Sequence, residues 1–420
     1  MMTNTNYDEQ LLEQWQSEPI DSQSNEEEFR SYTQYYDDVF STQSQRTYFA
    51  TYMKGLLSTL DRKSIEPIAL HFLGEKSVRP MQLFFTRSPL KEEKILEAYQ
   101  ARLANALNCE GGMLSVDDTG FIKKGTHSAG VKRQYCGRTG KRENCQIGVF
   151  MAYAGDEGYG LVDRELYIPK EWFEESYKKL REEAGIPPEK VFRTKNQIAQ
   201  EMLNQALTSG RFKVKWVGGD AAFGSSYEFL DGLKLPEGVW YFANVSSRQH
   251  VFREYPEMIF PPKKQGHRKH AQPSVDPVTI ASIAEDPKIP WETITLGEGT
   301  KGPIQAERKC IRCVTCRKDG CWYYLKPGDA IWLYLRKYEN EDIKCFVTNA
   351  PADISIKELD RAATLRWPIE QCFEECKSNL GMTHYEGRTY TAWTRHILFV
   401  MITHLFTTEI RKKVKKKESP

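Results

Sequence analysis

A short stretch of residues 366–380 combines charged and apolar side chains at helical spacing. At about 100° per residue, one face of the expected helix is apolar and carries Ile369, Phe373, Cys376 and Leu380. One edge of that face carries two acids and two bases, Arg366, Glu370, Glu374 and Lys377. Carboxylates bracketed by cations at the rim of a core suit a cleft that binds an anionic ligand. The alternative is an ordinary amphipathic helix with i, i+4 ion pairs on its solvated side.

Two aspartate motifs upstream favour the cleft. Asp117 and Asp118 end one short apolar run, and Asp220 ends a second run that is rich in β-forming residues. Glycines lie beside both motifs, and they let another backbone or a ligand approach closely. One aspartate from each motif and Glu370 form a carboxylate trio, which can hold two divalent metal ions about 4 Å apart for phosphoryl transfer. The pattern leaves open whether Asp117 or Asp118 is the first ligand.

The spacing of Arg366, Glu370 and Lys377 resembles the R-(3)-E-(6)-K signature of cut-and-paste DDE transposases of bacterial insertion sequences. The two aspartate motifs resemble that family's first and second acidic positions. Further similar segments lie at residues 52–57, 63–66, 130–135 and 144–146, and the resemblance covers about residues 45 to 410. The signature begins with a tyrosine three residues before the arginine, where this chain has Ala363, so only the R-E-K part is carried over.

The resemblance implies a metal-dependent DNA nuclease and strand transferase. Asp117, Asp220 and Glu370 are expected to hold two Mg²⁺ ions, which Mn²⁺ can replace, and Arg366 and Lys377 to hold phosphates near the scissile bond. The enzyme is expected to bind terminal inverted repeats in double-stranded DNA, to cut there and to join the 3′-hydroxyl ends to target DNA, as a homodimer assembled on DNA. Two alternatives are a ribonuclease-H-like DNA nuclease without strand transfer and a catalytically inactive, transposase-derived DNA-binding protein.

The elements that must position these residues fit an α/β fold. Strands are predicted at 113–117, 145–154, 158–167, 213–219 and 239–245, with helices near 195–208 and 225–234. This order fits a ribonuclease-H-like mixed sheet with flanking helices, formed by residues 111–245 and 351–410, which the resemblance also implies. Many more residues separate Asp220 from Glu370 than a minimal core needs. The intervening residues 246–350 alternate aromatic and polar side chains and are predicted to form a β-rich insertion domain.

Charge is distributed unevenly along the chain. The formal net charge is +2, yet residues 1–40 carry ten acids and one base, so the remainder carries +11. Residues 1–42 are predicted to be an acidic disordered tail. Residues 43–110 are predicted to be a helical DNA-binding domain, and residues 411–420 a basic tail suited to non-specific DNA contact. A basic body favours a polyphosphate partner, because each neutralised phosphate releases counterions.

A run of cations without an acid follows the first aspartate motif. Its members are Lys123, Lys124, Lys132, Arg133, Arg138, Lys141 and Arg142. Because several glycines interrupt the run, it is predicted to be a loop that clamps DNA phosphates. The alternative is a solvated charge run with no ligand.

Several other classes of protein are disfavoured. The spacing of Cys310, Cys313, Cys316 and Cys321 fits no common zinc module, although it leaves metal binding open. The chain contains no P-loop and no GxGxxG motif, so neither ATP nor a dinucleotide is implied. Because no apolar run reaches 18 residues and the N-terminal stretch lacks an apolar core, we expect a cytoplasmic protein without a membrane segment. The resemblance to bacterial transposases further implies association with the nucleoid.

Overall fold

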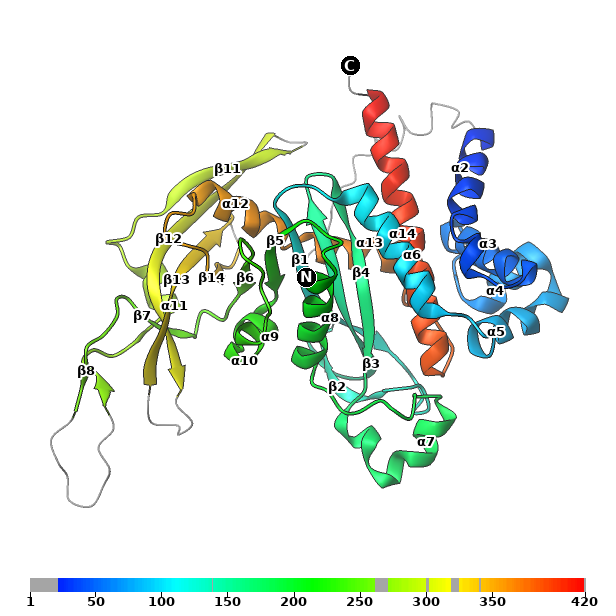
Figure 1. Cartoon of the computed structure of the whole chain (residues 1–420), viewed down its shortest axis with the longest axis horizontal. Helices are drawn as coiled ribbons and strands as arrows, with labels where there is room; N and C mark the ends of the chain where they lie inside the picture. The colour runs from blue at the N-terminus through cyan, green and yellow to red at the C-terminus, as the bar shows by residue number, and fades with distance from the viewer. Residues whose placement is uncertain are drawn as a thin grey trace.

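The computed structural model of the chain describes residues 22–137, 139–260, 271–299, 302–318, 325–339 and 341–418. Its centre is a large mixed sheet with helices packed around it (Figure 1). The strand order is β10-β7-β12-β13-β14-β6-β5-β1-β3-β2, with β11 beside β12 and β4 beside β3. The predicted mixed α/β class with flanking helices is therefore confirmed.

The part of the sheet that carries both aspartate motifs has the five predicted strands, the first of them longer than predicted, and one strand, β2, that was not predicted. They are β1 (Gly112–Ile122), β2 (Lys132–Cys136), β3 (Lys141–Gly155), β4 (Gly158–Tyr167), β5 (Val214–Gly219) and β6 (Trp240–Asn244). β1, β5 and β6 run parallel, whereas β3 pairs antiparallel with β1, β2 and β4. This mixture of directions is consistent with a ribonuclease-H-like sheet. The basic run is not a loop throughout, because β2 and the start of β3 form a hairpin there.

Residues 246–350 are rich in strands, and these strands extend the central sheet. The elements are β7 (His250–Phe252), β8 (Met258–Ile259), β9 (Gln272–Pro273), β10 (Val278–Thr279), α11 (Ile280–Glu285), β11 (Glu292–Gly299), β12 (Gly302–Lys318), β13 (Leu325–Lys337) and β14 (Lys344–Thr348). β14 pairs antiparallel with β6, which joins this stretch to the strands that carry the aspartate motifs. It also has a hydrophobic cluster of its own around Val251, Ile280 and Leu333.

Helices cover both faces of the sheet. After β4 come η3 (Lys170–Phe173), η4 (Glu175–Tyr177), α7 (Lys178–Glu183), α8 (Lys195–Ser209), α9 (Ala221–Gly224) and α10 (Tyr227–Asp231). After β14 come α12 (Ile356–Leu365), α13 (Pro368–Ser378) and α14 (Tyr390–Glu418). α14 is long, but none of the described helices is long and apolar enough to cross a membrane.

The N-terminal helices pack against α14. They are α2 (Ser22–Gln34), η1 (Asp37–Val39), α3 (Gln43–Leu57), α4 (Ile65–Leu73), η2 (Glu75–Ser77), α5 (Val78–Thr86) and α6 (Glu92–Leu107). α3, α5 and α6 contact α14, which lies beside them in Figure 1, and they share one continuous hydrophobic core with the sheet. Residues 43–110 therefore do not form a core separate from that of the sheet.

The predicted disordered tail is wrong from Ser22 onward, because α2 and η1 are folded onto the core. Tyr32, Tyr36 and Phe40 are buried, and the Tyr32 hydroxyl donates a hydrogen bond of 2.8 Å to the carbonyl oxygen of Ile402. The guanidinium of Arg102 lies 4.0 Å from the centroid of the Tyr32 ring. Aromatic side chains at helical spacing outweigh the acidic composition of this segment. Residues 1–21 of the predicted tail lie outside the described residues.

The predicted basic C-terminal tail is helical up to Glu418, because α14 continues to that residue. Three of its cations have acidic partners on other elements. Arg411 pairs with Glu375 at 3.1 Å, Lys412 with Glu157 at 2.6 Å and Lys413 with Glu28 at 3.0 Å. Residues 419–420 lie outside the described part of the chain.

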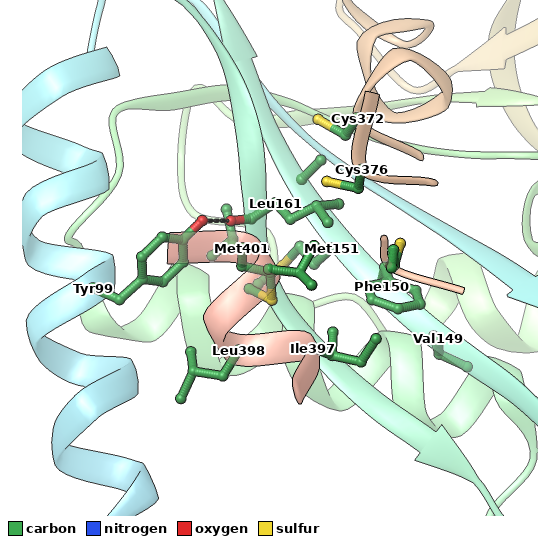
Figure 2. Close-up of a cluster of buried hydrophobic side chains, with 14 of the residues drawn as sticks. Tyr99, Val149, Phe150, Met151, Leu161, Cys372, Cys376, Ile397, Leu398 and Met401 are labelled. Carbon is green, nitrogen blue, oxygen red and sulfur yellow. Dashed lines mark hydrogen bonds between the residues drawn. The ribbon is translucent and has the colours of Figure 1, made fainter. Parts of the chain in front are cut away.

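Figure 2 shows the hydrophobic core beside α13. Phe150 and Met151 of β3 pack with Cys372 and Cys376 of α13 and with Met401 of α14. The hydroxyl of Tyr99 on α6 donates a hydrogen bond to the carbonyl oxygen of Leu161 on β4 (Figure 2). Apolar packing therefore fixes one side of α13, and its charged side chains lie away from that side.

Candidate active site

Neighbouring parallel strands bring the two aspartate motifs together. Val116 of β1 pairs with Gly219 of β5, so Asp117 and Asp220 follow directly at adjacent positions. Asp220 also caps the short helix α9, since its Oδ1 accepts hydrogen bonds from the backbone N–H groups of Ala222 (2.9 Å) and Phe223 (3.3 Å). These amides fix the orientation of the Asp220 carboxylate.

The third acid, Glu370, lies in the first turn of α13. Pro368 stands at the first helical position, and the buried face of the helix consists of Ile369, Cys372, Phe373 and Cys376. Glu370 points away from this face, and its side chain is 48% exposed. The predicted amphipathic helix is confirmed, although Arg366 precedes it, at the C-terminal cap of α12.

The three acids line one cavity of about 610 Å³. Its acidic lining consists of Asp117, Asp118, Asp220, Glu370 and Glu374. Its basic lining consists of Lys195 and Lys377. The structure thus brings together the three predicted metal ligands, which come from three distant segments of the sequence.

Arg366 binds two of the acids. Its Nη2 lies 3.5 Å from Oδ2 of Asp117, and its Nη1 donates a hydrogen bond to the carboxylate of Glu370. The side chain of Arg366 is only 7% exposed. It was predicted to hold DNA phosphates, but in this structure it holds the site's own carboxylates.

Burial changes the ionisation of the two aspartates. It raises the pKa of Asp117 to about 7; Arg366 opposes that rise and Asp220 adds to it. Burial also raises the pKa of Asp220, against the lowering effect of Arg366 and of the backbone amides that cap it. Both carboxylates are therefore costly to keep charged without a cation beside them.

Asp117 and Asp118 face opposite sides of the sheet. The carboxylate of Asp118 pairs with Lys195 of α8 at 2.8 Å, whereas Asp117 faces Arg366. Thr119, which follows on the strand, accepts a hydrogen bond of 2.5 Å from Lys377 of α13. Because successive side chains of a strand alternate, α8 and α13 cover opposite faces of β1. This geometry favours Asp117 as the partner of Glu370.

Two residues of the cavity were not among the predicted site residues. Lys195 begins α8, far from either aspartate motif, and only the packing of α8 on β1 brings it to Asp118. Tyr135 of the hairpin also lines the cavity and is 61% exposed. Ala363, at the position of the signature tyrosine, is only 1% exposed and presents no side chain to the cavity.

The predicted DNA-binding cations separate into two groups. Lys123 donates a hydrogen bond of 2.7 Å to the carbonyl oxygen of Tyr385, and burial lowers its pKa to about 8. Lys132 forms an ion pair with Glu171. The remaining cations, which are exposed on or beside the β2–β3 hairpin, are Lys124, Arg133, Lys141 and Arg142. Arg138 lies outside the described residues.

No preformed metal centre is present among the described residues: no three His, Cys, Asp or Glu side chains are grouped closely enough to hold a metal ion. Cys310 and Cys313 lie three apart on β12, where residues at that spacing point to opposite faces, and Cys316 lies further along the same strand. This arrangement does not support a shared metal at these three positions. Cys321 falls outside the described residues.

A buried ionic network connects α13 to β4 and α14, and no pattern in the sequence predicted it. Oε1 of Glu375 accepts hydrogen bonds from the Tyr159 hydroxyl (2.8 Å) and from Arg411 (3.1 Å), and its Oε2 lies 2.6 Å from Nε2 of His404. Burial would raise the pKa of Glu375, but the bonds from His404, Arg411 and Tyr159 outweigh it and lower the pKa to about 2. Glu375 thereby ties α13 to β4 and α14.

Comparisons with known proteins identify the family to which the chain belongs. A family model described as DDE superfamily endonuclease matches residues 36–303, which include both aspartate motifs. A protein from Microchaete diplosiphon, described as a probable transposase for insertion sequence element IS701, is 28% identical over 373 residues. That alignment covers 84% of this chain and 81% of the relative.

Proposed function

The chain belongs to the DDE superfamily of endonucleases, and from that premise we propose that it is a transposase that cuts DNA at the ends of its insertion sequence and joins the freed 3′-hydroxyl ends to target DNA. The likeness to the IS701 protein supports transposition as the biological role. The observation that carries the proposal is the convergence of Asp117, Asp220 and Glu370 on one cavity.

The donor chemistry of the cavity fits divalent metal ions. Carboxylate oxygens are the ligands that Mg²⁺ prefers, and a family of DDE endonucleases implies dependence on a divalent metal, generally Mg²⁺. We assign Asp117, Asp220 and Glu370 as the ligands of two ions, for which Mn²⁺ can substitute. When bound, the metal would activate the attacking oxygen and stabilise the leaving oxygen.

The surrounding residues would hold the DNA. Lys377 and Lys195 present ammonium groups to the cavity from opposite faces of β1, where they can attract phosphates on either side of the scissile bond. The exposed cations of the β2–β3 hairpin, Lys124, Arg133, Lys141 and Arg142, would contact the backbone further out. The helices within residues 43–110 would bind the terminal repeats. We propose a homodimer assembled on double-stranded DNA, acting at the bacterial nucleoid in the cytoplasm.

The proposal is tested with DNA that carries the inverted repeats flanking the coding sequence. Asp117→Asn, Asp220→Asn and Glu370→Gln should each lower Mg²⁺-dependent nicking by about a hundredfold or more, because the ligand set is lost. Binding to the same DNA, measured by gel shift, should persist because it rests on the basic surfaces. The matched control is Glu182→Gln, an exposed acid of α7, which should nick at the wild-type rate.

The outcomes separate the alternatives. Nicking at the wild-type rate by Asp220→Asn would refute the assignment of the site. Nicking by the wild-type protein without any product joined to target DNA would favour a nuclease that lacks strand transfer. Binding without nicking by the wild-type protein, in Mg²⁺ or Mn²⁺, would favour an inactive DNA-binding descendant.

A further inference from the structure

Arg366 lies between Asp117 and Glu370, two of the acids that line the cavity. Its Nη1 binds the Glu370 carboxylate, its Nη2 lies 3.5 Å from Asp117, and its Nε is buried without a hydrogen-bond partner among the described residues. With a side chain that is 7% exposed, it has little access to solvent. In this structure, the Arg366 guanidinium is therefore held by the carboxylates of Asp117 and Glu370.

This arrangement conflicts with metal binding at the same acids. One oxygen of each acid faces the Arg366 guanidinium, Oδ2 of Asp117 and Oε1 of Glu370, so a divalent cation shared by these two acids would lie beside that group. A guanidinium within 4 Å of a dication is strongly repelled, especially in a poorly solvated cavity. The absence of a three-ligand group among the described residues agrees with this, since Glu370 is engaged by Arg366. Arg366 must therefore leave before all three acids can share metal.

A displaced Arg366 needs another anion. Its guanidinium has five N–H donors in a planar fork, and leaving these donors buried without acceptors is costly. A phosphate group matches the fork with two parallel hydrogen bonds. The cavity beside Arg366 carries Lys195 and Lys377, and the β2–β3 hairpin at its mouth carries Arg133 and Arg142, so a DNA strand is the anion that this region attracts.

We propose that Arg366 is an internal counter-ion that closes the acid site in the DNA-free protein, and that a DNA phosphate draws it away so that the acids become available to metal. The inference rests on the proposed function and adds to it that DNA binding and metal binding are coupled. By thermodynamic linkage, DNA raises the affinity for metal by the same factor by which metal raises the affinity for DNA. The metal centre would then assemble only on the substrate.

The test measures Mn²⁺ binding directly, from the electron paramagnetic resonance signal of free Mn²⁺, with and without a short duplex of random sequence. Binding by the duplex alone is measured separately and subtracted. For the wild-type protein, the duplex should raise the Mn²⁺ affinity by about tenfold or more. In Arg366→Gln, the DNA-free protein should already bind Mn²⁺ about tenfold more tightly than wild type, and the duplex should add little.

Two further variants make the test specific. Arg366→Lys keeps the positive charge and should restore weak Mn²⁺ binding without DNA, which a purely structural role of the arginine would not explain. Arg361→Gln on α12, whose side chain pairs with Asp156 instead of the site acids, should behave as wild type. A duplex effect below about twofold on the wild-type protein would overturn the proposal even if Arg366→Gln failed to fold.

The same measurement separates this inference from the proposed function. If Asp117→Asn and Asp220→Asn bind Mn²⁺ as the wild type does, with DNA present, the acids are not ligands and the proposed function fails. If those variants lose Mn²⁺ binding but Arg366→Gln binds no more tightly than wild type without DNA, only the counter-ion role fails.

Discussion

Replacing Glu375 with glutamine is expected to destabilise the fold by about 3 kcal/mol at neutral pH. Glu375 accepts hydrogen bonds from Tyr159 and Arg411 and pairs with His404, whose side chain is 1% exposed. Glutamine keeps the shape of the side chain but removes its charge. It therefore leaves the Arg411 guanidinium without a full counter-charge and weakens the hydrogen bond with the buried imidazole of His404.

The magnitude follows from the pKa of the carboxylate. The difference between its ordinary pKa of 4.5 and the value of about 2 in the folded chain corresponds to about 3 kcal/mol of stabilisation. Removal of one partner from a buried ion pair costs about 3–5 kcal/mol in other proteins, which agrees with this value.

The sign of the pH dependence follows from the same shift. Because the folded pKa lies below the unfolded one, the stabilisation is fully present above about pH 4.5 and is lost as the pH falls toward 2. At pH 3, about 2 kcal/mol of it should already be lost. The difference in stability between wild type and Glu375→Gln should therefore shrink from about 3 kcal/mol at pH 7 to about 1 kcal/mol at pH 3.

Urea unfolding followed by circular dichroism, at pH 7 and at pH 3, measures both quantities. Glu374→Gln is the matched control, since it makes the same change at the next, exposed position of α13 and should alter stability by no more than about 0.5 kcal/mol. A cost below about 1 kcal/mol for Glu375→Gln, equal at the two pH values, would refute the assigned network.

Two other perturbations test surfaces described above. Arg133→Ala combined with Arg142→Ala should weaken binding to specific and random duplexes by the same factor and should reduce the slope of log affinity against log salt concentration by about 2. Lys132→Ala should weaken binding less, because Glu171 already pairs with Lys132. A loss confined to the specific duplex in gel-shift titrations would mean that the hairpin reads bases. Tyr32→Phe should cost about 1 kcal/mol in urea unfolding, because it removes the hydrogen bond to Ile402. An unchanged midpoint would show that α2 does not dock on α14.

Local patterns in the sequence were sufficient to select three acids that the structure places around one cavity. Strand ends at Asp117 and Asp220 can be recognised from β-rich runs beside glycines, and parallel strands end at the same edge of a sheet. The face that Asp117 or Asp118 presents to α13 cannot be derived in this way, because it depends on which helix covers which side. Lys195 has the same difficulty, since its approach to Asp118 is a result of tertiary packing.

The charged segments were harder to interpret than the acids of the site. Composition led to the prediction of a disordered tail, although Phe29, Tyr32, Tyr36 and Phe40 repeat at helical spacing within it. The partners of some cations lie far away in sequence, as Tyr385 does for Lys123, at a separation of 262 positions. Composition reports how many charges a segment has, and only the fold determines which of them already have partners.

The position of α14 in the chain has a consequence for protein synthesis. This helix packs on β4, α3, α5 and α6, yet a ribosome makes it some 200 residues after Asp220, which at about 5–20 residues per second takes about 10–40 seconds. During that interval the nascent chain holds both aspartates but lacks Glu370 for most of the time and α14 for all of it. A chain that stops short of Tyr390 would expose the apolar faces of these elements and would be a substrate for proteases. Because α13 also contacts α14, such a chain would lack part of the packing that holds Glu370 beside the two aspartates.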